Sequence, residues 1–253
     1  SLRGWNITGH DIMQEYQVFE LTKQSGVWLM SHYQDAYSAC LSITILPTII
    51  QAFTGISDQY VYKLIFQMFF ALIAPLLYVS LSNHVSRTTA FLATVVFITF
   101  PAFLTDITML NRQETAILCL MLAIIAGLDQ NFSPRVRQAT ALIFLLGMVI
   151  SHYSTSYVAT AMIILPWILG LFIRTIDIGW KRLNVIRDQP SIFSWWVVLI
   201  TFGCLVVWNG PITHTGGNFS KTAQGITDAI TATSSKPAPG PEQPELLDKD
   251  PLA

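Results

Sequence analysis

The chain has 253 residues, of which 52% are hydrophobic and only 11% are charged. A soluble domain carries about 25% charged residues, so this composition argues against a water-soluble protein and favours one whose surface faces lipid. The formal net charge of −1 argues against a nucleic-acid partner, because such a partner requires a basic face.

Residues 1–60 predict an extracytoplasmic segment with interfacial or re-entrant helices. Residues 1–39 are amphiphilic and contain no apolar run long enough to cross a membrane. Residues 40–54 are apolar but too short to span, and Pro47 interrupts them, which is typical of a helix at the membrane surface. The polar and aromatic start of the chain suggests that it begins inside a longer protein, just after an earlier span.

Six apolar runs follow between residues 61 and 209, and they predict an all-α, polytopic transmembrane bundle. The predicted spans cover about residues 61–82, 89–104, 115–128, 138–151, 156–173 and 192–209. The second, third and fourth runs are shorter than the roughly 20 residues that cross the hydrocarbon layer. Short spans are tolerated where their polar ends line a water-filled cleft walled by protein, so we expect a cleft at one face.

The loops between the predicted spans differ in charge. The first, third and fifth loops contain seven of the 14 basic residues, which are Arg87, Arg135, Arg137, Arg174, Lys181, Arg182 and Arg187. The second and fourth loops contain one, Arg112. The positive-inside rule then makes the first set cytoplasmic, and it places the N-terminal segment and the loop with Arg112 outside.

Residues 210–253 are Gly/Thr-rich and then Pro-rich and acidic, which predicts a flexible outer loop or the ragged end of the chain.

Four polar clusters fall on the predicted outer face, and the first contains Asp11 and Glu15. A helix places two residues at this spacing on one face. Like charges repel there, whereas two close carboxylates can divide roles, one as a base and one as a cation ligand or orienting group. The alternative is a solvated loop helix without a site.

The second cluster runs from Asp106 to Glu114 in the second loop. Arg112 is the single basic residue of the two short outer loops. An arginine at the mouth of a membrane cleft can clamp a phosphate with two parallel hydrogen bonds. The alternative is a structural ion pair with Glu114 or Asp106.

The third cluster, residues 151–157, contains six hydroxyl side chains and His152. This density of donors suits a sugar or a diphosphate, although Ser and Thr also satisfy free carbonyls where transmembrane helices turn. His152 could equally be a buried structural histidine. The fourth cluster, residues 209–214, contains a Gly-Pro pair that mostly terminates a helix.

These stretches resemble the GT-C superfamily of polytopic glycosyltransferases, which use polyprenyl-phosphate-linked sugars. In that superfamily the first outer loop carries an acidic catalytic motif and interfacial helices, and His10–Tyr16 and Cys40–Thr54 match this order. Three stretches also resemble a family of uncharacterised archaeal and bacterial membrane proteins: His10–Tyr16 with Leu41–Pro47, Asn111–Glu114 and Ser151–Tyr157. The superfamily's first span, later spans and soluble C-terminal domain have no counterpart in this sequence.

The resemblance implies an inverting sugar transfer from a lipid-phosphate donor at the outer face of the plasma membrane. It implies that Asp11 is the general base and that Glu15 orients the acceptor or binds a divalent cation. Arg112 would hold the donor phosphate. The other implied contacts to substrate are His10, Gln113, Glu114, His152 and Tyr153, and a metal would take Asp11, Glu15 or Asp106 as ligands.

Three other functions remain open from the sequence. A transporter or flippase of lipid-linked saccharides would place polar residues near the bilayer midplane, often in repeated halves. A polymerase or ligase of the same lipid-linked pathway would share the outer-face chemistry. A non-catalytic membrane subunit would show no dependence of activity on Asp11. In every case the expected partners include membrane lipids.

Overall fold

The computed structural model describes residues 7–31, 33–101, 110–175 and 192–217, all within one structural unit that ends at Gly217. These residues form helices and, over the described ranges, no strand. The elements are α1 (His10–Ser25), α2 (Leu41–Thr54), α3 (Asp58–Tyr60), η1 (Val61–Ile65), α4 (Phe66–Ser82), α5 (Arg87–Thr99), α7 (Asn111–Leu128), α8 (Pro134–Ser151), α9 (Tyr153–Thr175), α11 (Trp195–Val207) and η3 (Trp208–Ile212). The predicted all-α class is therefore confirmed.

Three helical stretches are long and apolar enough to cross a membrane: Asp58–Ser82, Asn111–Leu128 and Trp195–Ile212. They indicate a membrane protein. The predicted span at 89–104 corresponds to α5, which ends at Thr99. The helix stops there because Phe100 precedes Pro101 and takes an extended conformation, as the residue before a proline usually does.

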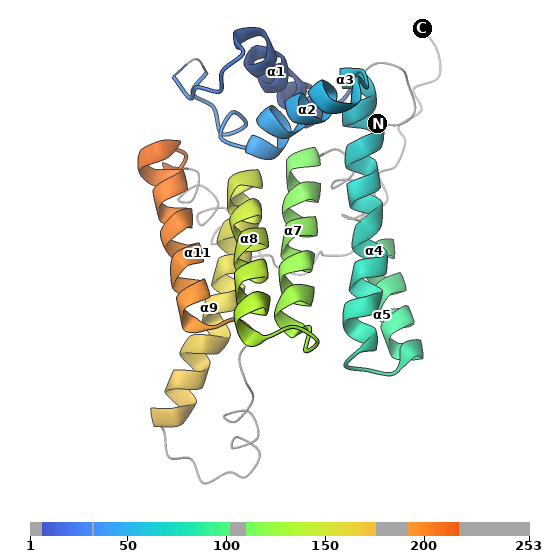
Figure 1. The fold of residues 1–253 in the computed structure, drawn as a ribbon, viewed down its shortest axis with the longest axis vertical. Helices are drawn as coiled ribbons and strands as arrows, with labels where there is room; N and C mark the ends of the chain where they lie inside the picture. The colour runs from blue at the N-terminus through green and yellow to red at the C-terminus, as the bar shows by residue number, and fades with distance from the viewer. Residues whose placement is uncertain (1–6, 32, 102–109, 176–191, 218–253) are drawn as a thin grey trace, which may run out of the picture. The chain divides into compact units, whose positions relative to one another are not determined.

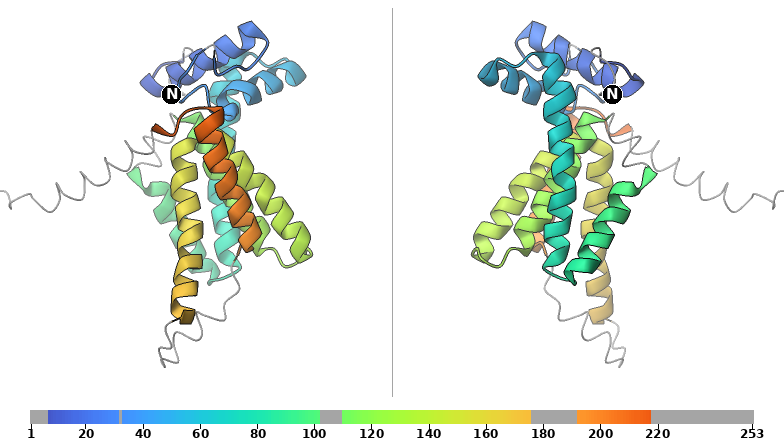
Figure 2. Two further views of the ribbon diagram at one scale, coloured as in Figure 1. Left: turned by 90° about the vertical axis from the view of Figure 1, so that its left-hand side faces the viewer. Right: turned by 90° about the vertical axis from the view of Figure 1, so that its right-hand side faces the viewer.

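Helices α1 and α2 lie across one end of the bundle formed by α4, α7, α8, α9 and α11 (Figure 1). Helix α7 starts at this end, α8 returns to it, and α9 starts from it again (Figures 1 and 2). We call it the α1–α2 end. The short turns that join α4 to α5 and α7 to α8 lie at the opposite end, where the chain carries Arg87, Arg135 and Arg137.

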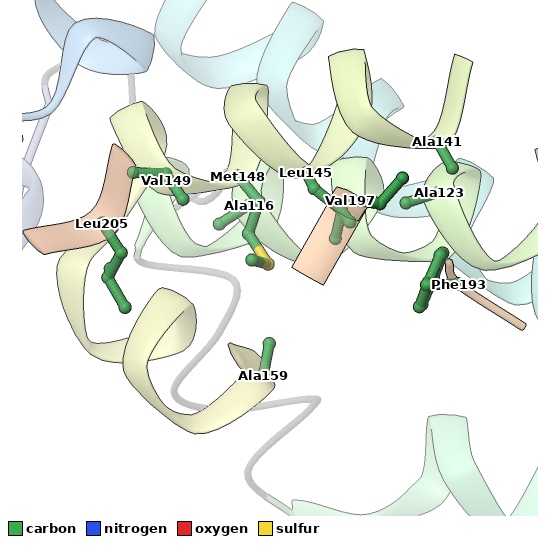
Figure 3. Packing of buried hydrophobic residues seen from close by; sticks show 10 residues of the cluster. All are labelled: Ala116, Ala123, Ala141, Leu145, Met148, Val149, Ala159, Phe193, Val197 and Leu205. Atoms are coloured by element: carbon green, nitrogen blue, oxygen red, sulfur yellow. The ribbon is translucent and has the colours of Figure 1, made fainter. Parts of the chain in front are cut away.

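A hydrophobic core joins α7, α8, α9 and α11, as Figure 3 shows. Its ten buried residues are Ala116, Ala123, Ala141, Leu145, Met148, Val149, Ala159, Phe193, Val197 and Leu205. Small residues in it allow the helix backbones to approach closely. At Gly147 an added Cβ would lie 3.2 Å from the Cys119 sulfur, so α7 and α8 pack without room for a side chain there.

A second core attaches the α1–α2 end to the first candidate span. It consists of Ile12 and Phe19 of α1 with Val61, Tyr62 and Phe66. These aliphatic and aromatic side chains are buried, and their removal from water or headgroups stabilises the crossing position of α1. The expected surface helices of residues 1–60 are thus anchored on one side by packing.

The helix expected over residues 40–54 is present as α2, which runs from Leu41 to Thr54 with Pro47 inside it. Proline has no N–H, so it cannot bond the carbonyl four residues earlier, which belongs to Ile43. The hydroxyl of Tyr62 donates to that carbonyl instead, at 2.5 Å. A buried side chain from another helix therefore replaces the missing backbone hydrogen bond.

The hydrogen bond from Tyr62 to the Ile43 carbonyl should contribute to the stability of the fold. Tyr62→Phe leaves the Ile43 carbonyl without a donor, and we expect it to lower the free energy of unfolding by about 1–3 kcal/mol. Adding Pro47→Ala restores an N–H at the right position, so the double variant should recover much of the loss. Thermal unfolding in detergent measures both, and a double variant no more stable than Tyr62→Phe would contradict this role of Tyr62.

Candidate functional site

Arg112 lies at the centre of a polar cluster at the α1–α2 end. It belongs to the first turn of α7 and is only 6% exposed. Around its guanidinium lie Glu15 from α1, Tyr37 from the segment before α2, and Tyr153 from the start of α9. Three polar clusters that are far apart in the sequence therefore meet around one arginine.

Glu15 binds both the arginine side chain and the helix that carries it. Its Oε1 lies 3.4 Å from Nε of Arg112, and its Oε2 accepts the backbone N–H of Asn111 at 3.1 Å. The N-cap residue of α7 is Leu110, which offers no side-chain acceptor. A carboxylate at a helix N-terminus satisfies a free amide and interacts favourably with the helix dipole, so α1 supplies the cap that α7 lacks.

Burial of the Glu15 side chain disfavours its ionised form. Burial raises the pKa of this carboxyl to about 8, although Arg112 and the amides of Asn111 and Arg112 lower it. The side chain is 0% exposed, so it touches neither solvent nor a substrate. Its contacts make Glu15 a positioning residue for Arg112.

Asp11 is the accessible carboxylate of the cluster, with 43% of its side chain exposed. Its Oδ1 accepts a hydrogen bond of 2.6 Å from the hydroxyl of Tyr37. The ring of Tyr37 lies 3.8 Å from the Arg112 guanidinium carbon, within the range of a cation–π contact. Burial, together with the hydrogen bond to Asp11, raises the pKa of Tyr37, so its hydroxyl stays a donor and connects the carboxylate to the arginine.

The α8–α9 junction differs from the loop that residues 151–157 suggested. Helix α8 ends at Ser151 and α9 begins at Tyr153, so His152 alone separates them. The hydroxyl of Ser151 donates to the Gly147 carbonyl, and that of Ser156 donates to the carbonyls of Met148 and His152. These two hydroxyls satisfy the backbone at a helix junction, which is the structural alternative considered from the sequence.

His152 adds no positive charge beside Arg112. Burial lowers the pKa of its imidazole to about 3, and the charge of Arg112 acts in the same direction. Its Nδ1 lies 2.8 Å from the Thr155 hydroxyl. The neighbouring ring of Tyr153 lies 5.3 Å from the imidazole and 5.9 Å from the guanidinium carbon of Arg112, so Tyr153 is the member of this pair that contacts the cluster directly.

The remaining predicted site residues lie at the edges of the cluster around Arg112, or outside it. His10 is exposed, and its Nδ1 lies 3.6 Å from Oδ1 of Asp11. Gln113 lies half-buried in the first turn of α7. Glu114 is buried, and its Oε1 accepts a hydrogen bond of 3.0 Å from Gln67 of α4. Asp106 lies outside the described residues.

The fourth predicted cluster has a structural explanation. Asn209 is buried, its Nδ2 donates to the Leu205 carbonyl, and its Oδ1 accepts from the Thr215 hydroxyl. Trp208 beside it stacks on Trp28 with ring centroids 5.8 Å apart. These contacts close the end of α11 and η3 against the segment before α2.

A metal centre of the common kind is not formed in the described ranges. Within them, no three or more His, Cys, Asp and Glu side chains are grouped to hold an ion. Asp11 and Glu15, two possible metal ligands from the sequence, contact Tyr37 and Arg112 respectively.

Sequence reasoning missed Tyr37, Asn111 and Gln67. Tyr37 is one of several aromatics in the N-terminal segment, and nothing in the local pattern distinguishes it. Asn111 acts partly through its backbone amide, which every residue type but proline has. Gln67 did have a signal, since a polar side chain within an apolar span is a functional candidate by default.

Arg112 retains unused hydrogen-bonding capacity. Its Nη1 is buried and has no hydrogen-bond partner among the described residues, and its Nε has only the Glu15 carboxylate nearby, at 3.4 Å. An anionic oxygen is the natural acceptor for the free Nη1. The cluster therefore combines a cation that has a free donor with a carboxylate that is accessible to solvent, one aromatic ring away.

Comparisons with protein-family models, with curated proteins and with solved structures give no significant match.

The raised pKa of Glu15 predicts how the stability of the fold depends on pH. Between about pH 4.5 and 8 the folded chain binds more protons than the unfolded chain, because burial raises the pKa of this carboxyl from 4.5 to about 8. Stability should therefore fall as the pH rises through this window. We expect Glu15→Gln to flatten the fall of melting temperature with pH, whereas Glu20→Gln on the same helix should keep the parental slope. A Glu15→Gln curve parallel to the parent's would contradict this assignment.

Proposed function

We propose that the chain is a membrane glycosyltransferase of the GT-C type, which moves a sugar from a polyprenyl-phosphate-linked donor to an acceptor hydroxyl. The observation that supports it is the connection from Arg112, whose Nη1 has no partner among the described residues, through Tyr37 to Asp11. This places a buried cation beside an accessible carboxylate at one end of the helices.

The proposed reaction uses both groups. The acceptor oxygen attacks the anomeric carbon, its proton goes to the Asp11 carboxylate, and the bond from that carbon to the phosphate oxygen breaks. The departing phosphate gains negative charge, and a preorganised cation stabilises this charge in a site that excludes water. Arg112 supplies that cation, and its planar fork matches two phosphate oxygens. Tyr153 is placed to contact the donor beside it.

Six spans and an outward-facing site form part of the proposal. Asp58–Ser82, Asn111–Leu128 and Trp195–Ile212 meet the length and hydropathy of a span, and α5, α8 and α9 correspond to the other predicted spans. The helices alternate in direction (Figure 1). In this topology the turns with Arg87, Arg135 and Arg137 are cytoplasmic by the positive-inside rule, and the α1–α2 end faces outward in the plasma membrane.

A transporter of lipid-linked saccharides is the second candidate, and the pairing of half-buried Gln67 with buried Glu114 favours it. Both side chains lie within candidate spans and bond each other. Polar pairs of this kind mark ion or substrate paths in membrane proteins. Glu114 lies in the first turn of α7, however, at the end of a span and not at its middle, where transporters usually bind their substrates.

The catalytic role of Asp11 is testable by Asp11→Asn, which keeps the shape and removes the basicity. We expect turnover to fall by about 10²–10⁴-fold with the melting temperature little changed, because Asp11 is half-exposed. The assay measures sugar transfer from a panel of polyprenyl-phosphate donors in nanodiscs. Asp129→Asn, an acid at the far end of α7, serves as the matched control. Unchanged turnover in Asp11→Asn would remove Asp11 from the mechanism, and no transfer by the parent would favour the transporter.

The orientation is testable by cysteine labelling in intact cells with a membrane-impermeant maleimide. Gln24→Cys on α1 should react, and Ser133→Cys in the α7–α8 turn should react only after permeabilisation, because the two exposed positions lie at opposite ends of the helices. The unsubstituted chain gives the background labelling. The reverse pattern would contradict the orientation and with it the outward-facing site.

A further inference from the structure

Two buried oxygen atoms at the α1–α2 end have no partner among the described residues: Oδ1 of Asn111 and Oε2 of Glu114. A third, Oε1 of Glu15, makes no hydrogen bond and has only Nε of Arg112 nearby, at 3.4 Å. All three residues are 0% exposed, and native proteins contain few buried acceptors without a donor. These acceptors on two packed helices indicate a positively charged ligand.

The contacts among these residues place them in one region. The Asn111 amide donates to Glu15 Oε2 at 3.1 Å. Asn111 and Glu114 are three residues apart on α7, which brings their Cβ atoms to about 5–6 Å on one helix face. The carboxyl groups of Glu15 and Glu114 also interact electrostatically. Asn111 Nδ2 points to the Tyr62 backbone carbonyl at 3.5 Å, which adds a fourth oxygen at the edge of the group.

The ligand set and the charge balance select the kind of ion. Carboxylate and amide oxygens suit hard cations and not the softer transition metals. Magnesium usually keeps several waters, and calcium takes six to eight oxygens, more than this buried group offers. Glu15 and Glu114 carry two negative charges when ionised and Arg112 carries one positive charge, so a single positive charge completes the balance. We propose that Glu15, Asn111 and Glu114 bind one sodium ion between α1 and the first turn of α7.

Sodium and protons compete for this site, because a carboxyl group must lose its proton before it coordinates a cation. The charged and titratable groups that face Glu15 are Arg112 and Glu114 on α7, Asp11 on α1, the Cys40 thiol and the Tyr62 hydroxyl. Burial is the largest influence on the pKa of Glu15, which rises to about 8 even though Arg112 and two backbone amides lower it. Sodium should therefore bind most tightly above this pH and lose to protons well below it.

A thermal-shift titration of the full chain in detergent tests the sodium site without any need for turnover. Choline chloride is replaced stepwise by sodium chloride at constant ionic strength and about pH 8.5. At a hundredfold excess over the dissociation constant we expect the melting temperature to rise by about 5–10 °C. At about pH 6 the same titration should give a smaller rise, because protons then occupy the carboxyl groups.

Glu114→Gln is the decisive variant, because it can satisfy the same neighbours without an ion. The new amide still offers an oxygen to Gln67, and its N–H₂ group can donate to Oδ1 of Asn111. We expect this variant to fold at least as stably as the parent in choline and to lose the sodium-dependent shift. Glu20→Gln, an acid of α1 outside the group, should keep it.

Two results would overturn the sodium site. One is a parent melting temperature that is equal in choline and in sodium. The other is a shift that persists in Glu114→Gln. A melting temperature that responds to pH alone, and not to sodium, would show that a proton completes the charge balance and would likewise reject the ion. None of these results bears on sugar transfer by Asp11 and Arg112, which the activity assay tests separately.

Discussion

The contact of Glu15 with Arg112 and Asn111 joins the helix that lies across the bundle to a helix that runs through it. Helix α7 begins at the α1–α2 end without a side-chain cap of its own, and α1 supplies one. The guanidinium held by this contact is the surface on which Tyr37 packs, and Tyr37 in turn holds Asp11. If the ion pair were absent, α1 would still be held by the core of Ile12 and Phe19, but the guanidinium that Tyr37 packs on would lose its fixed position.

A buried ion pair such as Glu15–Arg112 adds little to the stability of a fold by itself. Removing two charges from water costs several kcal/mol per ion, and a buried pair often does no better than a hydrophobic pair of the same volume. Breaking one partner, in contrast, costs about 3–5 kcal/mol because the other charge is left uncompensated. The value of the pair therefore lies in specifying one position for Arg112, which a site that recognises an anion requires.

Hydropathy was sufficient to locate the helices, because a membrane helix needs a continuous apolar run whatever its partners are. It failed at their polar ends. The sequence assigned Arg112, Gln113 and Glu114 to a connection, whereas they form the first turn of α7, stabilised by a cap from a residue about 100 positions earlier. The position of Asp11, Arg112 and His152 at one end of the helices was predictable from the alternation of loops. The role of Tyr37 was not, because it exists only once α1, α2 and α7 are packed together.

The one-residue junction between α8 and α9 limits how the site can open. A connection of this length contains no slack, and the Ser156 hydroxyl of α9 bonds the carbonyls of Met148 in α8 and of His152, so α9 cannot tilt from α8 without displacing His152 itself. The α1–α2 layer is held instead by side chains: the core of Ile12 and Phe19, the stack of Trp28 on Trp208 and the contact of Tyr37 with Arg112. Under the proposed function, entry of a lipid-linked substrate would have to displace some of these side-chain contacts, while the α8–α9 hairpin stays rigid.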